Sequence, residues 1–461
     1  MLLITFFFSF FAQNQPIITA DSMVVIQQIN IVGNQKTKVN IIERELDFVL
    51  GDSIKKEDLA KRLDLNRRKL VNTNLFITVE INYTQSSDNQ IIINIKLLEQ
   101  WYLLGYPIFQ IADRNYAEWF ERGASLSRTT YGIDLIHSNF RGRAERINLR
   151  LETGFTQRVD LGYRIPYIDK AMKTGAGFSL SYITNKTLAF RSLNDTLNYV
   201  RNLDNILRKR FLGSIYLRKR FHFYDNHTLE LRYNHNTIAD TISKLNPDYF
   251  LGNRTAQQYF QLSYYFNYDF RDNVAYPLRG KRYELTVNKL GLFPNDDINQ
   301  LEITGGASWY KSLSKKFFYG LNLRAKISFP ERQPFYNTRG LGYFTDLVRG
   351  YELYVVDGSS FFLARNNLRY QLVNSKIRLK FLKAKQFNEV PIGIYPNFFA
   401  DFGYVQNRFR EVNQSKLANR ALFGGGFGVD FVTYYNLVIR LSYVINDRKE
   451  KNVVFSIGRE F

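Results

Sequence analysis

The stretch "QQYFQLSYYFNYDF", residues 257–270, alternates apolar and polar side chains from residue 260 onwards. Because successive side chains of a β-strand point to opposite faces, each face of this strand has its own chemistry. One face carries Phe260, Leu262, Tyr264, Phe266 and Tyr268, and the other carries Gln261, Ser263, Tyr265, Asn267 and Asp269. Strands of soluble sandwiches also alternate, but they are usually shorter than about ten residues. A strand this long, and this rich in Phe and Tyr, predicts a membrane β-barrel with a lipid-facing exterior and a polar interior.

The same pattern recurs from about residue 125 to the end of the chain, for example in "RINLRLET" (146–153) and "NLVIRLSYVI" (436–445). We count about sixteen such segments, the first starting near residue 129, one near 187 and the last near 451, and barrels of bacterial outer membranes have an even strand number. Long connections at 239–257, 331–359 and 406–421 contrast with short turns elsewhere, an asymmetry typical of these barrels. Residues 129–461 are therefore expected to form a transmembrane antiparallel β-barrel.

Residues 24–100 have a different pattern. "VVIQQINIVGN", "FITVEINY" and "QIIINIKLLEQ" predict strands, whereas "TKVNIIERELDF" and "KKEDLAKRLDLNRRKLVNTN" have apolar residues at helical spacing. The order β-α-α-β-β describes a small α+β domain, and residues 101–128 are expected to be a linker. Such a sheet leaves an edge free to pair with a strand of another chain, and the candidate strand carries Ile77, Val79 and Ile81 on one side. A purely structural domain is the alternative.

The N-terminal stretch "MLLITFFFSFFAQNQ" has an apolar core of about ten residues, the length found in a signal peptide and too short to cross a membrane as a helix. We expect residues 1–20 to be a cleaved signal peptide, with a frayed N-terminus as the alternative. No later apolar run approaches the roughly eighteen residues of a membrane helix.

The composition argues against an enzyme and against nucleic-acid binding. The chain has no cysteine and four dispersed histidines, and it lacks HExxH and GxSxG motifs; "GGGFG" (424–428) lacks the Lys of a phosphate loop. We therefore expect no catalytic residue, no metal site and no cofactor. The net charge of +21 is spread along the strands, which fits a water-filled lumen or anionic lipid headgroups better than nucleic acid.

Several motifs resemble one known family, the BamA and TamA superfamily of outer-membrane proteins. "LVNTNLFITVEINY" (70–83) resembles the end of a POTRA domain, and "HSNFRGRAERINLRLETG" (137–154) is similar to the hairpin that opens these barrels. The remaining matches are "YDFRDNVAYPLRGKRYEL" (268–285), "VRGYE" (348–352), "FADFG" (399–403) and "VVFSIGREF" (453–461). The resemblance implies a sixteen-stranded barrel in the outer membrane of a diderm bacterium, with one POTRA domain in the periplasm.

The resemblance also implies site residues. The sixth-loop motif is Val348, Arg349, Gly350, Tyr351 and Glu352. Arg349 is expected to enter the lumen and bind Asp401, which lies in a strand motif with Phe399 and Gly403. Family members often have a second acidic acceptor on the strand after the loop, but "FFLARNNLRYQLV" has none. Arg349 is therefore expected to bind Asp401 alone, or to bind Glu352 or Asp430 as well. The C-terminal strand signal comprises Phe455, Ile457 and Phe461.

Members of this superfamily insert other β-barrels into the outer membrane or translocate polypeptides across it, without ATP. Our first hypothesis is an assembly factor that uses POTRA strand augmentation and a seam between the first and last barrel strands, about 129–138 and 451–461. The alternatives are a dedicated polypeptide translocator and a passive pore or structural partner. The implied partners are unfolded outer-membrane or secreted polypeptides, other assembly or lipoprotein subunits, outer-membrane lipids and lipopolysaccharide.

Overall fold

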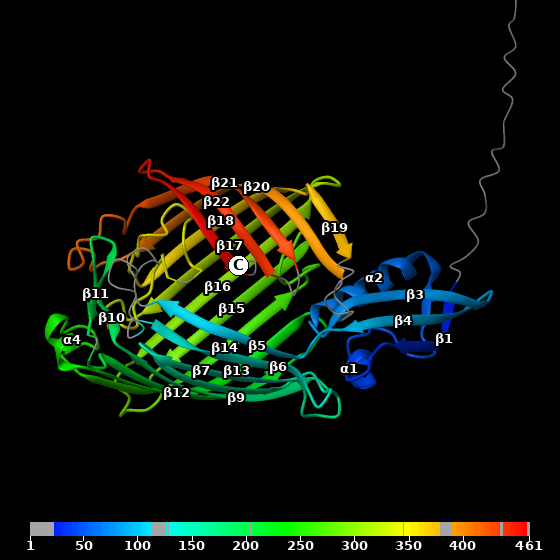
Figure 1. Cartoon of the computed structure of the whole chain (residues 1–461), viewed down its shortest axis with the longest axis horizontal. Coiled ribbons are helices and arrows are strands. Elements are labelled where there is room, and N and C mark those ends of the chain that lie inside the picture. Colours follow the sequence, from blue (N-terminus) through cyan, green and yellow to red (C-terminus); the bar gives the residue numbers. More distant parts are fainter. Residues whose placement is uncertain are drawn as a thin grey trace, which may run out of the picture.

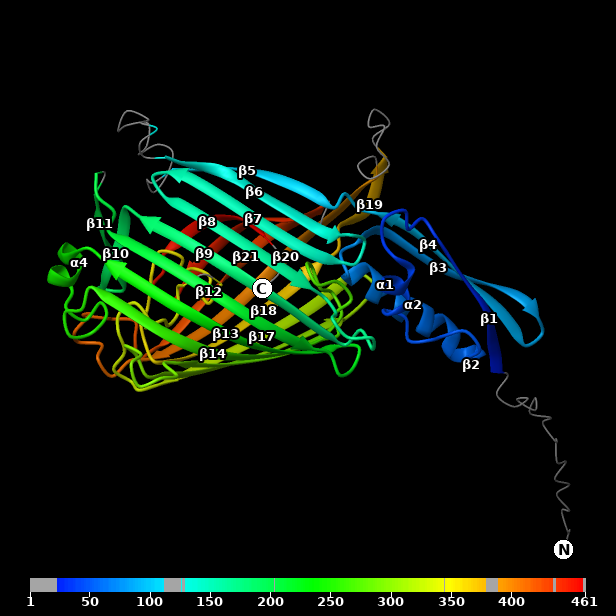
Figure 2. The same ribbon diagram turned by 90° about the horizontal axis from the view of Figure 1, so that it is seen from below.

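The protein consists of a β-barrel and a small α+β domain that lies at one end of the barrel (Figures 1 and 2). The computed structural model describes residues 23–111, 126, 129–202, 204–343, 345–378, 389–433 and 437–458. Within this part of the chain, no helix is both long enough and apolar enough to cross a membrane.

The N-terminal domain folds in the order β-α-β-α-β-β. Its elements are β1 (Met23–Val32), α1 (Val39–Glu43), β2 (Ser53–Lys55), α2 (Lys56–Asn72), β3 (Phe76–Ser87) and β4 (Gln90–Glu99). The sheet order is β2-β1-β4-β3, with β1 and β4 parallel, so β3 is an edge strand. The sheet has four strands instead of the three expected, because the three-residue strand β2 pairs with β1. Its core is formed by the isoleucines of β4 and by Leu59, Leu63 and Leu70 on one face of α2.

The barrel is built from long antiparallel strands. Its strands are β5 (Leu103–Ile111), β6 (Thr129–Phe140), β7 (Glu145–Gly154), β8 (Gln157–Ile165), β9 (Thr174–Asn185), β12 (Arg208–Lys219), β13 (Asp225–Ile238), β14 (Ala256–Asp269), β15 (Gly280–Leu290), β16 (Gln300–Ser312), β17 (Phe317–Phe329), β18 (Ser360–Tyr370), β19 (Val373–Arg378), β20 (Glu389–Gln406), β21 (Ala421–Thr433), β22 (Leu437–Asn446) and β23 (Lys451–Gly458). Since β18 and β19 pair with successive parts of β20, they occupy one position, and these seventeen labels describe a barrel of sixteen strand positions.

The strand number agrees with the expectation, but two assignments were wrong. The expected linker 101–128 contains β5, which pairs with β6 and is the first barrel strand. Pro107 obscures this strand in the sequence, because proline lacks the N–H of a ladder and is tolerated mainly at edges. The segment near residue 187 forms β10 (Thr187–Leu193), which pairs with β11 (Thr196–Arg201) in a separate hairpin. Its apolar residues Leu188 and Phe190 pack against other loops instead of facing outwards.

The outer face of the barrel carries large exposed apolar side chains. On β12, Ile215 and Leu217 are 62% and 55% exposed, and on β20 Phe398 is 65% exposed. The inner face carries ion pairs such as those joining Arg150 to Glu152 and Arg232 to Glu230. An apolar exterior around a charged interior is the arrangement that a lipid bilayer stabilises.

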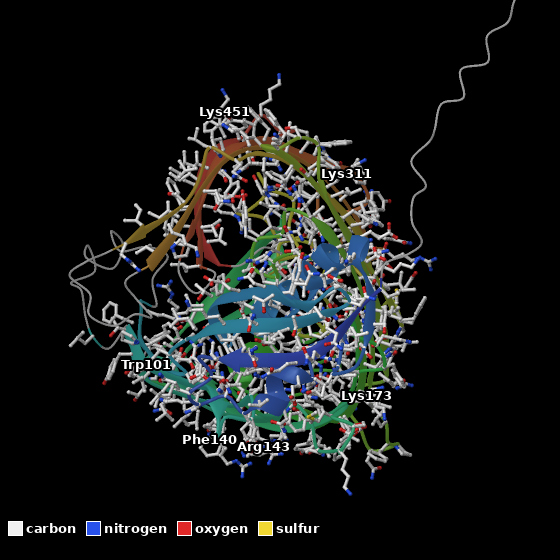
Figure 3. All side chains as sticks on the ribbon, turned by 90° about the vertical axis from the view of Figure 1, so that its right-hand side faces the viewer. Trp101, Phe140, Arg143, Lys173, Lys311 and Lys451 are labelled. Carbon is white, nitrogen blue, oxygen red and sulfur yellow. The ribbon has the colours of Figure 1, made fainter. Side chains whose placement is uncertain are left out.

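The two ends of the barrel differ. At one end the N-terminal domain lies across the opening (Figure 3). There, Arg220 donates to Glu45 at 2.9 Å, and Lys38 N–H donates to Gly142 O at 2.9 Å. At the opposite end lie the β10–β11 hairpin, the short helix α4 (Asp240–Leu245) and the loop between β17 and β18 (Figure 1).

Candidate functional site

The loop between β17 and β18, residues 330–359, folds back against the inner wall of the barrel. Its backbone is held by the wall: Lys326 Nζ donates to Arg339 O at 2.7 Å, and Arg365 Nη1 donates to Thr345 O at 2.9 Å. Asp346 also forms an ion pair with Arg324 at 2.8 Å. Three basic side chains of β17 and β18 therefore fix the course of the loop before it reaches Arg349.

Arg349 binds Asp401 on β20 through two side-chain bonds and one backbone bond. Nε lies 2.8 Å from Oδ2, and Nη2 lies 2.5 Å from Oδ1, while the Arg349 N–H donates to Oδ2 at 3.1 Å. The Asp401 side chain is completely buried and that of Arg349 is 15% exposed. A planar guanidinium can make this bidentate contact and an ammonium cannot.

The remaining contacts of Arg349 come from neutral groups. Nη1 donates to Asn367 Oδ1 at 2.7 Å, and Nη2 lies 3.3 Å from Asn366 O. The guanidinium carbon lies 3.9 Å from the centroid of the Phe399 ring, within the range of a cation–π contact. Asn367 thus supplies a second side-chain acceptor on the strand after the loop, and it is an amide instead of a carboxylate.

Neither alternative acceptor from the sequence binds Arg349. Glu352 accepts the N–H of Gly350 with both carboxylate oxygens at 3.0 Å. Asp430 accepts a hydrogen bond of 2.8 Å from Tyr276 and lies 3.5 Å from Arg440. The role of Asn367 was missed in the sequence, although the alternation along "FFLARNNLRY" places it on the inward face with Arg365 and Arg369.

Glycines allow the motif to approach the wall closely. Gly350 has a φ of +99°, a conformation that favours glycine, and its carbonyl oxygen accepts a hydrogen bond of 2.8 Å from Asn446 Nδ2. A β-carbon at Gly424 on β21 would overlap the carbonyl oxygen of Arg349. At Gly403, which the sequence analysis placed in the strand motif, a β-carbon would overlap Val348 and lie 2.8 Å from Leu341 Cδ1.

The motif also contacts the turn between β22 and β23. Tyr351, which is 3% exposed, donates to Asp447, and Tyr354 donates to Glu450 at 2.7 Å. Burial, followed by the hydrogen bond to Asp447, raises the pKa of Tyr351, so its hydroxyl stays a donor at neutral pH. The loop therefore connects β20 to the last hairpin of the barrel.

The other sequence-predicted residues lie apart from this site. Phe455 on β23 points outwards and is 63% exposed. Ile457 pairs with Ile439 of β22. The side chain of Ile457 and the whole of Phe461 lie outside the described part of the chain. In the N-terminal domain, Val79 and Ile81 belong to the core, whereas a register shift between Phe76 and Thr78 leaves Ile77 only half-buried.

The seam lies between β5 and β23, and the expectation that residues 129–138 form the first strand was wrong. These two strands are neighbours in the closed barrel. Within the described residues, the register of backbone pairing is defined residue by residue from β5 through β9 and β12 to β18, and from β18 and β19 through β20 to β23. The seam differs from the expected one because β5 pairs with β6 and is therefore the first strand of the barrel.

A closed barrel with an apolar exterior, a charged lumen, an inward-folded loop and a preceding α+β domain defines an outer-membrane β-barrel protein. Residues 139–461 match the family model described as the Omp85 superfamily domain, and the chain belongs to this superfamily. Proteins of this superfamily are assembly or translocation proteins that act on polypeptides, and they are not enzymes.

Solved structures with the same fold share little sequence with the chain. BamA from Haemophilus ducreyi lacking POTRA domains 1–3 is 17% identical, with a TM-score of 0.52 over 94% of this chain and 84% of that one. CdiB from Escherichia coli is 12% identical, with a TM-score of 0.57 over 95% and 76% of the two chains. CdiB from Acinetobacter baumannii is 12% identical, with a TM-score of 0.51 over 95% and 74%. No curated protein matches the sequence.

Proposed function

We propose that the chain is an assembly factor that helps to insert β-barrel proteins into the outer membrane. In this proposal residues 1–20 are a cleaved signal peptide, and the α+β domain is a POTRA domain in the periplasm. The clients are unfolded outer-membrane or secreted polypeptides. Outer-membrane lipids, lipopolysaccharide and other assembly or lipoprotein subunits are the proposed further partners.

The observation that carries this proposal is the double attachment of the Arg349 loop. Arg349 is bound to Asp401 on β20, while Tyr351 and Tyr354 are bound to Asp447 and Glu450 in the turn before β23. A loop that holds both sites fixes the position of the last hairpin, and so of one side of the seam. Unpaired backbone groups are costly in lipid, so a seam that opens favours pairing with an incoming strand.

The edge strand β3 supports delivery of a client to the barrel. It pairs with β4 on one side and ends the sheet on the other. Val79 and Ile81 are buried on the side of the sheet that faces the helices, so an added strand would meet the β3 backbone without disturbing the core. Pairing of this kind supplies affinity through main-chain hydrogen bonds and accepts many sequences.

Assembly at the seam fits the structure better than transport through the lumen. At the end opposite the N-terminal domain, Asp195 of the β10–β11 turn accepts from the N–H groups of Lys416 and Leu417 at 2.8 and 3.0 Å. Ser192 donates to Asp357 of the Arg349 loop, and Val355 N–H donates to Asp195 O at 2.8 Å. A translocator or an open pore would require these three loops to separate.

Disulfide crosslinking of the seam tests the proposal, because the chain has no cysteine of its own. We would combine a cysteine at Ile108 of β5 with single cysteines along β23. The matched control joins β22 to β23 through Tyr443→Cys with Val453→Cys, which are register partners within one side of the seam. The assay is insertion of a barrel client into vesicles before and after reduction.

We expect the seam crosslink to abolish client insertion and reduction to restore it, while the control crosslink leaves insertion unchanged. Unchanged insertion with a fully formed seam crosslink would contradict the assembly proposal. If polypeptide transport across the vesicle membrane also persists in that protein, the translocator alternative is favoured.

A further inference from the structure

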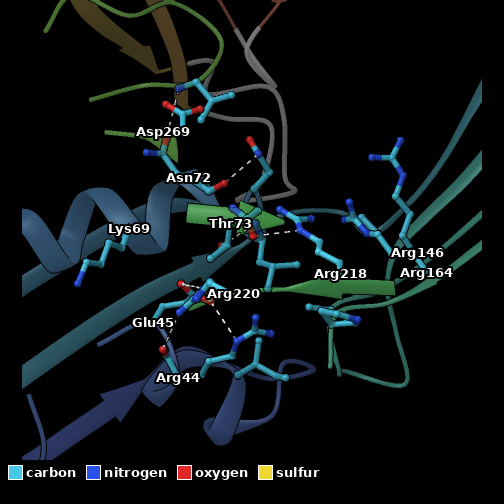
Figure 4. Close-up of a pocket in the computed structure, with 18 of the residues that line it drawn as sticks. Arg44, Glu45, Lys69, Asn72, Thr73, Arg146, Arg164, Arg218, Arg220 and Asp269 are labelled. Atoms are coloured by element: carbon cyan, nitrogen blue, oxygen red, sulfur yellow. Dashed lines mark hydrogen bonds and ion pairs between the residues drawn. The ribbon is translucent and has the colours of Figure 1, made fainter. Parts of the chain in front are cut away.

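A cavity of about 570 Å³ lies between the N-terminal domain and the barrel lumen (Figure 4). Its walls come from α2 of the N-terminal domain, from the inner face of barrel strands including β7, β8 and β12, and from Leu104 and Tyr106 of β5. The cavity therefore lies where a polypeptide leaving the N-terminal domain would reach the first strand of the barrel.

The lining of this cavity is strongly basic. It includes nine arginine or lysine residues and two carboxylates, Glu45 and Asp269. Both carboxylates are already engaged: Glu45 binds Arg220 at 2.9 Å, and Asp269 binds Arg271 at 2.6 Å. On the side of the N-terminal domain, Arg68 and Lys69 are also paired, with Asp64 at 3.1 Å and Asp47 at 3.4 Å, so the surplus positive charge lies mainly on the barrel side of the cavity.

Three arginines concentrate this charge on the barrel side. Arg146 on β7 and Arg164 on β8 are direct register partners, and like charges in this position are destabilising. Arg164 faces Gly177 of β9, and Arg218 of β12 faces Gly175, and the side chain that covers Gly177 is that of Tyr216 from β12. The result is a hollow bordered by guanidinium groups.

Arg164 and Arg218 lack the carboxylate partner that several other arginines of the lumen have. Arg158, Arg282 and Arg324 each lie 2.6 Å from a neighbouring carboxylate. Among the described residues, no carboxylate lies within ion-pair distance of Arg164 or Arg218. Arg218 Nε donates to the neutral Asn226 at 3.0 Å, and the buried Nε of Arg164 has no hydrogen-bond partner within the described residues. A buried donor without a partner in the protein is free to bind an acceptor from water or from a ligand.

We propose that this cavity binds an acidic segment of the client polypeptide, with Arg164 and Arg218 as the residues that bind its carboxylates. The inference rests on the proposed function, because it takes a polypeptide as the occupant. A carboxylate between the two arginines would relieve their repulsion and could accept charge-assisted hydrogen bonds. A second hollow of about 360 Å³ shares Arg218 with this cavity, so a segment of several residues has room to extend past Arg218.

The position of the cavity favours a polypeptide over a lipid. Arg164 and Arg218 lie on the inner face of their strands, whereas Leu217, the neighbour of Arg218, is 55% exposed on the outer face. A lipid headgroup outside the barrel would have to cross the barrel wall to reach them. The contact with β5 also places a bound segment beside the seam strand.

Peptide binding to the full-length protein in detergent tests this inference. The probe is a fluorescent twelve-residue peptide that alternates Glu and Ser, compared with a Lys and Ser peptide of equal length. The variants are Arg164→Gln with Arg218→Gln, and Arg164→Lys with Arg218→Lys. Lys219→Gln is the control for the loss of one positive charge, because it removes that charge from the adjacent, exposed position of β12.

We expect the wild-type protein and the Lys219→Gln control to bind the acidic peptide at least about tenfold more tightly than the basic one, in a salt-dependent manner. The double glutamine variant should lose at least about tenfold in affinity, and the double lysine variant should retain most of it. Heat-dependent gel mobility establishes that each variant remains a folded barrel.

Equal binding of the two peptides, or an unchanged affinity in the folded double glutamine variant, would overturn the inference. So would competition by glycerol phosphate but not by free glutamate peptides, which would identify a lipid headgroup as the occupant. The proposed assembly function is tested separately from this site, because the seam crosslink tests insertion without changing the lining of the cavity. Peptide binding that persists in a protein without insertion activity would leave this site intact and remove only the assembly role.

Discussion

Replacement of Arg349 by alanine is expected to release the β17–β18 loop from the barrel wall without unfolding the barrel. The change removes two bonds to Asp401, at 2.8 and 2.5 Å, and one to Asn367 at 2.7 Å. It also leaves the carboxylate of Asp401, whose side chain is completely buried, without its cation. Breaking a buried pair in this way costs about 3–5 kcal/mol.

That cost applies to docking of the loop, because the barrel ladder does not depend on Arg349. At about 1.4 kcal/mol for each factor of ten, the ratio of docked to released loop falls by roughly a hundredfold to several thousandfold. Arg349→Lys should have a smaller effect, because it keeps one charged contact but loses the bidentate geometry. Release of the loop should also loosen Tyr351 from the β22–β23 turn and reduce client insertion.

Limited proteolysis of the loop, measured beside client insertion, checks this expectation. The matched control is Arg254→Ala, which removes an ion pair of 2.8 Å with Asp297 whose side chains are 53% and 27% exposed. Such surface pairs contribute less than about 1 kcal/mol, so the β17–β18 loop of the Arg254→Ala control should remain protected from the protease. A folded Arg349→Ala barrel with wild-type protection and wild-type insertion would refute the reasoning and remove Arg349 from the mechanism.

Three further changes test neighbouring parts of the structure. Gly424→Ala should displace the loop at a cost of about 1–3 kcal/mol, which gel mobility after heating would show as a lower unfolding temperature. Gly305→Ala is its control and should have little effect, because no atom lies within 4 Å of the added carbon; equal unfolding temperatures for the two variants would contradict this. Asn367→Leu should cost about 1–3 kcal/mol of docking because it leaves Arg349 Nη1 without its side-chain acceptor, and unchanged protease protection would show that Asn367 is dispensable. Arg220→Ala should loosen the N-terminal domain from the barrel, and hydrogen exchange at Glu45 and its neighbours should rise; exchange equal to wild type would place the attachment elsewhere.

Local patterning was enough to predict the class of fold. The alternation in "QQYFQLSYYFNYDF" depends only on which side of a strand meets lipid, so every barrel strand with that pattern could be recognised from its own residues. The same is true of the helices and strands of the N-terminal domain, since Leu59, Leu63 and Leu70 share a face at helical spacing wherever the domain sits. Short or interrupted strands were not predicted from the sequence. β2 has only three residues, and β5 contains Pro107, a residue that is unfavourable inside a strand.

Pairing across the chain could be decided only by the tertiary structure. The sequence alone predicted the partnership of Arg349 with Asp401 through motif resemblance, but it could not show that Asn367 completes the arginine site, because that contact needs the loop to fold back onto β18. Nor could it distinguish β10, whose alternation matches a barrel strand, from a strand that faces lipid, since the difference lies in which loops cover Leu188 and Phe190. The basic cavity has the same origin: Arg146, Arg164 and Arg218 lie far apart in the chain, and only the strand register brings three like charges together around one hollow.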